Sequence, residues 1–235
     1  MKMYLTYQRL TDMGERIFSD FNYFFFGKSF DQKRDYVLPL MIDRFAKDYL
    51  GLTVEFSKLS NDGSICGLTA YTDTEYTADG KVLPLRQNEV ILDESFMKPD
   101  MVGKLCEKRR FTLAHECAHQ ILFRYGSDSE KQSFRKMYSE RRTYSLRDLK
   151  NKEDWNERQA NILAAAIMMP RKEINFAMQK YANGRKLISY DGWFGTKDYK
   201  IICELAETLG VSKKALIILL YNLGYVHDDY VKEVA

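Results

Sequence analysis

The sequence predicts an α+β fold, and three observations lead to this prediction. Within residues 51–95, short segments alternate apolar and polar residues between glycine-containing turns, which is typical of a small antiparallel sheet. Before and after this region, apolar residues recur at helical spacing. A His-Glu-x-x-His motif lies inside one of the later helical segments. We expect three parts: N-terminal helices over 1–50, a core over 51–183 and a helical region over 184–235.

The first part is predicted to contain two helices. One covers residues 12–27, where several phenylalanines fall near helical spacing, and the other covers residues 34–49. Gly51 follows the second helix, as a helix terminator commonly does. Alternation of apolar and polar residues then predicts short strands, which we place at 52–56, 68–71 and 88–93.

The helical pattern returns after Gly103. We expect helices at 103–125, 154–169 and 172–182, the second of which ends before Pro170. The polar and basic stretch 126–152 is predicted to be a loop or an exposed helical insertion. Glycines predict a loop over 184–195. Two more helices are expected within 197–225, separated at Gly210-Val211-Ser212.

The composition is that of an ordinary globular protein, with 45% hydrophobic and 29% charged residues. The net charge of +3 is small for a dedicated nucleic-acid binder. We find no secretory signal, and the longest apolar runs are far too short to span a bilayer. The four cysteines form no CxxC pair, which favours a reduced protein. We therefore predict a cytoplasmic protein with no membrane association.

The motif His115-Glu116-Cys117-Ala118-His119 predicts a zinc site. Residues four apart on a helix lie about 40° apart around its axis, so the two imidazoles converge on one point. Glu116 is rotated away from the metal ligands and can take a proton from a zinc-bound water. Two of the three histidines in the chain occupy this motif. The alternative is that both are ordinary helix residues, since the bare pattern also occurs by chance.

A catalytic zinc needs a third protein ligand and an open fourth position. The candidates are Asp128, Asp154, Glu157 and His227. Glu157 begins a long apolar helix, where a buried carboxylate requires a partner such as a metal. Spacing alone leaves an exposed glutamate of the first helical turn as an equal alternative.

Two segments of this chain resemble the ImmA/IrrE family of metallopeptidases. They are Arg110-Phe-Thr-Leu-Ala-His-Glu-x-x-His119 and Glu157-x-x-Ala-Asn161-x-x-Ala-Ala-x-x-Met-Met-Pro170. Either motif alone is weak, but the two together are specific. Weaker similarities extend the resemblance over most of the chain.

The resemblance implies a zincin-like domain that hydrolyses a peptide bond in a specific protein. In that family the counterparts of His115, His119 and Glu157 bind zinc, and the counterpart of Glu116 is the general base. The resemblance also implies the substrate: typically a helix-turn-helix repressor whose cleavage relieves repression, often in mobile elements or stress responses of bacteria.

Two residues beside the motifs need separate interpretation. Cys117 stands in a pair that is usually smaller in the family, and we expect it to be a buried apolar side chain rather than a reactive thiol. Asn161 lies one turn after Glu157 and is predicted to orient a zinc ligand, with helix packing as the alternative. The donor that stabilises the oxyanion stays open between His227, Tyr125 and other tyrosines.

Two other functions compete with the peptidase hypothesis. Residues 204–216 resemble a helix-turn-helix, which raises the possibility of a DNA-binding regulator. The second of these helices is apolar on nearly every side, and Lys213 and Lys214 offer few contacts for DNA, so we do not expect direct nucleic-acid binding. The third function is a protein-binding regulator that keeps the fold without hydrolysis, but such a protein has no need of Glu116.

Overall fold

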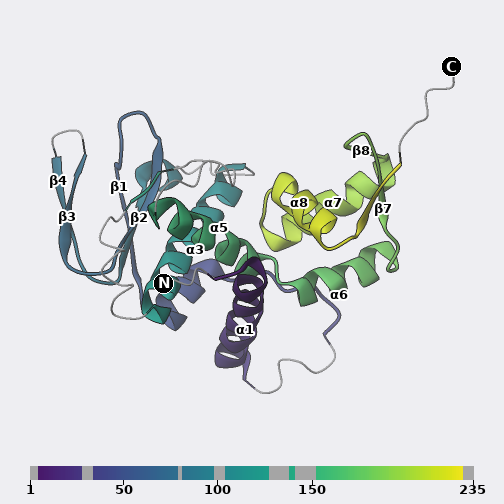
Figure 1. Ribbon diagram of the computed structural model, residues 1–235, viewed down its shortest axis with the longest axis horizontal. Helices are drawn as coiled ribbons and strands as arrows, with labels where there is room; N and C mark the ends of the chain where they lie inside the picture. Colours follow the sequence, from purple (N-terminus) through teal and green to yellow (C-terminus); the bar gives the residue numbers. More distant parts are fainter. Residues whose placement is uncertain are drawn as a thin grey trace.

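The protein has a mixed α+β architecture, which confirms the α+β part of the predicted fold (Figure 1). The computed structural model describes residues 5–27, 34–78, 81–97, 104–126, 138–140 and 152–229. The predicted insertion at 126–152 lies largely outside the described residues, which include only its two end residues and a strand at 138–140.

Helix α1 (Tyr7–Phe26) begins five residues before its predicted start. Thr6 caps its N-terminus, because the threonine hydroxyl accepts a hydrogen bond from the backbone N–H of Arg9 at 3.3 Å. The helix packs against α5 (Lys152–Met168). At Gly14 a Cβ atom would lie 2.5 Å from the Cβ of Ala166, so the two helices can approach this closely only because residue 14 is glycine.

The second predicted helix is shorter than expected. Helical structure covers only α2 (Ile42–Arg44) and the π-helical turn η2 (Phe45–Tyr49). Pro39 keeps the residue before it out of the helical region of backbone space. The backbone N–H of Leu38 instead donates to the buried carboxylate of Glu173 at 2.9 Å, which fixes this stretch outside a helix.

The central sheet has the strand order β1-β5-β2-β6. Its strands are β1 (Thr53–Ser57), β2 (Ile65–Ala70), β5 (Glu89–Asp93) and β6 (Tyr138–Glu140). β2 is antiparallel to both of its neighbours, but β1 and β5 are parallel, so the prediction of an antiparallel sheet is wrong for this pair. β5 lies between β1 and β2, although β2 precedes it in the chain. A separate antiparallel hairpin, β3 (Thr74–Ala78) and β4 (Lys81–Leu85), connects β2 to β5.

Helix α3 (Lys104–Tyr125) lies between the sheet and α5 (Figure 1). The short 3-10 turn η3 (Glu94–Met97) precedes it. The amide of Gln120 attaches α3 to the end of β2, because it donates to the hydroxyl of Thr69 at 2.8 Å and to the carbonyl of Ala70 at 2.9 Å. The helices predicted at 103–125 and 154–169 are therefore present with nearly the expected bounds.

The last part of the chain is helical with a small sheet. After α6 (Arg171–Ala182) come β7 (Leu187–Tyr190), β8 (Trp193–Phe194), α7 (Thr196–Leu209), α8 (Lys213–Asn222) and β9 (Val226–Asp228). The α7–α8 pair is confirmed, with Gly210 in the left-handed conformation between the helices. The loop predicted at 184–195 contains β7 and β8, joined by a tight turn at Asp191-Gly192 where both φ angles are positive.

One hydrophobic core cluster contains residues from all three predicted parts. It includes Leu10 from α1, Leu113 from α3, Leu163 from α5 and Leu205 from α7, each fully buried. A smaller cluster lies around the β3–β4 hairpin. In the described part of the chain, no helix has the length and apolar character that a membrane crossing requires.

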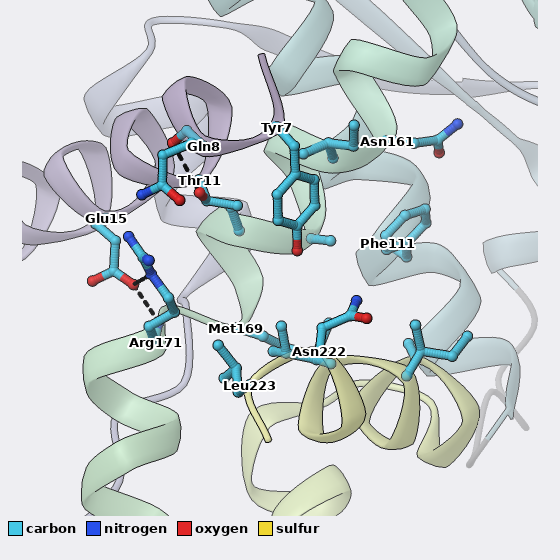
Figure 2. A pocket seen from close by; sticks show the side chains of 16 residues that line it. Tyr7, Gln8, Thr11, Glu15, Phe111, Asn161, Met169, Arg171, Asn222 and Leu223 are labelled. Carbon is cyan, nitrogen blue, oxygen red and sulfur yellow. Dashed lines mark hydrogen bonds and ion pairs between the residues drawn. The ribbon is translucent and has the colours of Figure 1, made fainter. Parts of the chain in front are cut away.

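A pocket of about 420 Å³ opens where α1, α5 and α8 meet, close to the first half of α3. Figure 2 shows Tyr7 of α1, Phe111 of α3 and Asn222 of α8 around this pocket. Most of the wall of the pocket is apolar, and Asn161 of α5 is among the polar residues that line the pocket.

Candidate metal centre

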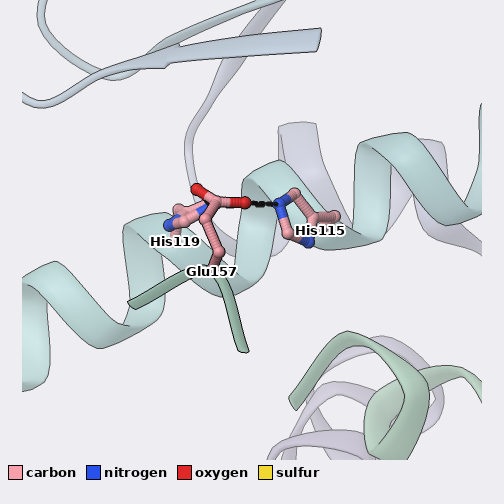
Figure 3. A group of neighbouring side chains, drawn as sticks. All are labelled: His115, His119 and Glu157. Carbon is pink, nitrogen blue, oxygen red and sulfur yellow. Dashed lines mark hydrogen bonds and ion pairs between the residues drawn. The ribbon is translucent and has the colours of Figure 1, made fainter. Parts of the chain in front are cut away.

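The two motif histidines and Glu157 lie together between α3 and α5. The imidazole Nε2 atoms of His115 and His119 are 3.0 Å apart. The Glu157 carboxylate faces both rings, with Oε2 at 3.1 Å from His115 Nε2 and Oε1 at 3.0 Å from His119 Nε2 (Figure 3). Residues four apart on α3 thus meet a carboxylate from the first half of α5, so the structure brings together the three side chains proposed as metal ligands.

This group has the chemistry of a site for a divalent metal ion. One donor atom from each of the three side chains lies within 4.8 Å of the others. In a tetrahedral zinc site with bonds near 2.0–2.1 Å, neighbouring donors are about 3.3 Å apart, close to the separations found here. Two Nε2 atoms that face each other at 3.0 Å repel one another unless a proton or cation lies between them. Two imidazoles and one carboxylate are also the donor types that zinc takes in hydrolases.

The electrostatics of the group favour a bound cation. Burial alone would raise the pKa of Glu157, but the two histidines outweigh it and hold this pKa at about 2. Burial alone would lower the pKa of His119, but the adjacent Glu157 carboxylate raises it overall. Glu157 therefore stays ionised over the physiological range, and a positive charge between the three side chains is stabilised.

The outer nitrogen atoms of the two imidazoles are not paired with described residues. The Nδ1 atoms of His115 and His119 are both buried, and neither has a hydrogen-bond partner in the part of the chain that the structure describes. Asn161 lies one turn beyond Glu157 and lines the pocket between α1, α5 and α8. Its predicted role in orienting a zinc ligand remains a prediction.

Glu116 is buried between α3 and the sheet, with 1% of its surface exposed. At Gly67 of β2, a Cβ atom would lie 2.8 Å from Oε1 of Glu116 and 2.8 Å from Cγ2 of Thr112. The side chain of the proposed base therefore occupies space beside β2 that any larger residue at position 67 would fill.

Tyr71 is a candidate residue that the sequence analysis did not single out. It follows the last residue of β2, is 5% exposed and stacks on Phe123 with ring centroids 4.5 Å apart. Burial raises its pKa well above the ordinary value, and the charges of Glu116 and Glu157 raise it further. The phenol is therefore a proton donor near the candidate base at neutral pH. Nothing in the sequence separates it from the other fifteen tyrosines except its position after a strand.

The remaining candidates lie elsewhere or outside the described residues. His227 is exposed on β9, and Tyr125 is 66% exposed at the end of α3. Asp128 and the side chain of Asp154 lie outside what the structure describes. Cys117 is fully buried, and burial raises the pKa of its thiol, so it remains protonated, as expected for a residue that packs in the core.

Comparison with known proteins supplies a family for this arrangement. Residues 106–221 match the family model described as the IrrE N-terminal-like domain of peptidase family M78. The match begins within α3 and ends within α8, so it contains His115, Glu116, His119 and Glu157. A search of curated proteins gave no match.

Proposed function

We propose that this chain, which belongs to the ImmA/IrrE family of metallopeptidases, is a zinc-dependent endopeptidase with a zincin-like core. The observation that carries the proposal is the approach of His115, His119 and Glu157 around one point, with Glu116 on the same helix as the histidines. A site that only holds a metal would need no carboxylate at position 116.

The three side chains would hold zinc and leave a fourth position open. With zinc held there, the site would have Lewis acidity available for activating a water molecule and polarising the substrate carbonyl. Glu116 takes the proton of the attacking water and passes it to the leaving amine. Its burial excludes bulk water from this transfer. The Tyr71 phenol, protonated at neutral pH, is our candidate for the hydrogen bond to the developing oxyanion.

For the substrate we propose a helix-turn-helix repressor in the cytoplasm, cut to relieve repression. This part of the proposal rests on the family resemblance. The alternative, a DNA-binding regulator, is less well supported because Leu216 and Leu220 turn one face of α8 into the core. A recognition helix needs polar side chains free for base edges.

The test uses Glu116→Gln as a substrate trap. The amide keeps the shape of the side chain and the three metal ligands but cannot act as a base. We expect the variant to bind zinc in the same ratio as wild type and to lose at least ~10³-fold in activity. Proteins captured by the variant from host lysate are then incubated with zinc-loaded wild type.

The outcomes of this test separate the proposals. Capture and cleavage of a small DNA-binding repressor supports both mechanism and role. Cleavage of an unrelated protein supports the peptidase and rejects the anti-repressor role. Zinc binding with full cleavage by Glu116→Gln would reject Glu116 as the base. Salt-dependent duplex binding without zinc or cleavage would favour the DNA-binding regulator.

A further inference from the structure

The pocket between α1, α5 and α8 lies one helical turn from the metal ligands on two helices. Phe111 lines it and precedes His115 by four residues on α3, while Asn161 lines it and follows Glu157 by four residues on α5. Residues four apart on a helix are surface neighbours, with Cβ atoms about 5–6 Å apart. The pocket therefore lies about one helical turn from the metal centre along both α3 and α5, and its lining does not include the three proposed ligands themselves.

The wall of the pocket is suited to an apolar group without charge. Ile162 and Ala165 of α5, Met169 just after that helix, and Ala215 and Leu219 of α8 line it, and apolar atoms supply most of the lining.

The charged residues at its margin already pair with one another. Glu15 accepts a hydrogen bond from the backbone N–H of Arg171 (Figure 2). The guanidinium of Arg171 also contacts Asp12 at 2.5 Å. The polar groups left to meet an occupant are neutral, such as the amides of Asn161 and Asn222. A charged occupant would lose its hydration without gaining a partner of opposite sign.

We infer that this pocket is the subsite that receives a large apolar side chain of the protein substrate, next to the bond that is cut. The inference rests on the proposed function and specifies its substrate. The volume of about 420 Å³ accommodates an aromatic or long aliphatic side chain. A substrate bound with its carbonyl at the metal would place a neighbouring side chain within a helical turn of that point. This position favours a part of the substrate over an independent small molecule.

The test compares two zinc-binding compounds that differ only in an apolar tail. Acetohydroxamate has a methyl group, and 4-phenylbutanohydroxamate has a phenylalkyl chain. Their dissociation constants are measured by titration calorimetry on the zinc-loaded protein. Burial of the tail should make the second compound bind at least ~10-fold more tightly to wild type. In Ala165→Phe the new ring fills the pocket, and this gain should fall below ~3-fold while acetohydroxamate binds as before.

Two further variants make the result specific. Ala215→Phe fills the pocket from α8, so it answers the same question if Ala165→Phe fails to fold. Val82→Phe adds the same ring to an exposed position of β4, where the side chain is 58% exposed, and should keep the full gain. In substrate cleavage, the pocket-filling variants should shift the preference beside the cut bond from large to small side chains.

The outcomes separate the subsite from the proposed function. If the apolar tail tightens binding equally in wild type and in both pocket-filling variants, the pocket is not the subsite. That result would leave the proposed zinc peptidase activity intact. Tight binding of the tailed compound to zinc-free His115→Ala would show an independent small-molecule site and also overturns the inference. Failure of wild type to bind zinc or acetohydroxamate would reject the proposed function itself.

Discussion

Glu116 packs against β2 at Gly67, where the strand has no side chain. Gly67→Ala would place a methyl group 2.8 Å from Oε1 of Glu116 and from Cγ2 of Thr112, so both side chains must move. We expect a loss of stability of about 1–3 kcal/mol. Because a displacement of the proposed base by ~1 Å can cost ~10²-fold in rate, kcat should fall at least ~10-fold if Glu116 has this role.

The measurement is kcat together with the zinc content of the purified variant, which should stay at the wild-type ratio. Gly195→Ala is the matched control, because a Cβ there meets nothing within 4 Å. Wild-type kcat in Gly67→Ala would mean that the position of Glu116 beside β2 does not matter for the reaction.

Tyr71 can be tested without disturbing its packing. Tyr71→Phe keeps the ring that stacks on Phe123 and removes only the phenol. If the phenol stabilises the oxyanion, kcat should fall about 10²–10³-fold with KM and zinc content unchanged. Single-turnover kinetics on a substrate identified by the trap would measure this. Full activity in Tyr71→Phe and loss in Tyr125→Phe would assign the role to Tyr125 instead.

At this scale the sequence predicts the part of the site that follows from helical geometry. His115 and His119 could be placed because their spacing alone brings two imidazoles to one point on a helix. Glu157 needed the family resemblance, because no local rule distinguishes it from other carboxylates. Tyr71 could not be found, because its position beside Glu116 and Glu157 depends on how β2 lies over α3.

At the scale of elements, long helices were predictable and short strands were not. α3 and α5 extend over many turns, so their apolar periodicity is clear in the sequence. β7 and β8 are only four and two residues long, too short for an alternating pattern to stand out. The parallel pairing of β1 with β5 depends on the insertion of β5 between β1 and β2, which is a property of the whole sheet.

The junction between β7 and α7 should make stability depend on pH. Asp198 accepts hydrogen bonds from the guanidinium of Arg185 and, at 2.8 Å, from the backbone N–H of Ile188. The Arg185 bond lowers the pKa of Asp198, burial opposes this, and the Ile188 bond lowers it further. Because the pKa of Asp198 is lower in the folded protein than in the unfolded chain, its ionised carboxylate stabilises the fold. This stabilisation is complete above the ordinary Asp pKa of about 3.9 and is lost as the pH falls through the pKa of Asp198 in the folded protein.

We therefore expect Asp198→Asn to be less stable than wild type at pH 7, with a difference that shrinks as the pH falls from 5 to 3. Urea unfolding of both proteins across this range measures the difference directly, and other titrating groups largely cancel. A difference that stays constant down to pH 3 would contradict this role for Asp198.

At the scale of the whole molecule, Arg110 connects three distant segments. Its guanidinium donates to the carbonyls of Leu40 at 2.8 Å, Gly210 at 3.1 Å and Leu209 at 3.4 Å. α3 is thereby linked to the segment before α2 and to the turn between α7 and α8. Because one core cluster includes residues from all of these segments, we expect them to unfold together.

Arg110→Met keeps an apolar chain of similar length and removes all three hydrogen bonds. We expect the free energy of unfolding to fall by about 2–4 kcal/mol in a single transition, since bonds from a charged donor contribute ~1.5–3 kcal/mol each and are not additive. Lys200→Met, at a side chain that is 77% exposed, is the matched control and should change the free energy of unfolding by less than ~0.5 kcal/mol. Two separate transitions in Arg110→Met would show that the C-terminal helices unfold independently.

The three proposed ligands come from the two helices at the centre of the core, 42 residues apart in sequence between His115 and Glu157. A metal that binds there binds only when both helices are packed, so ligand binding and folding are linked equilibria. At free zinc 100-fold above its dissociation constant, mass action adds about 2.7 kcal/mol to the free energy of unfolding. If the site holds zinc as proposed, the supply of zinc in the cell would then affect the stability of the folded protein as well as its activity.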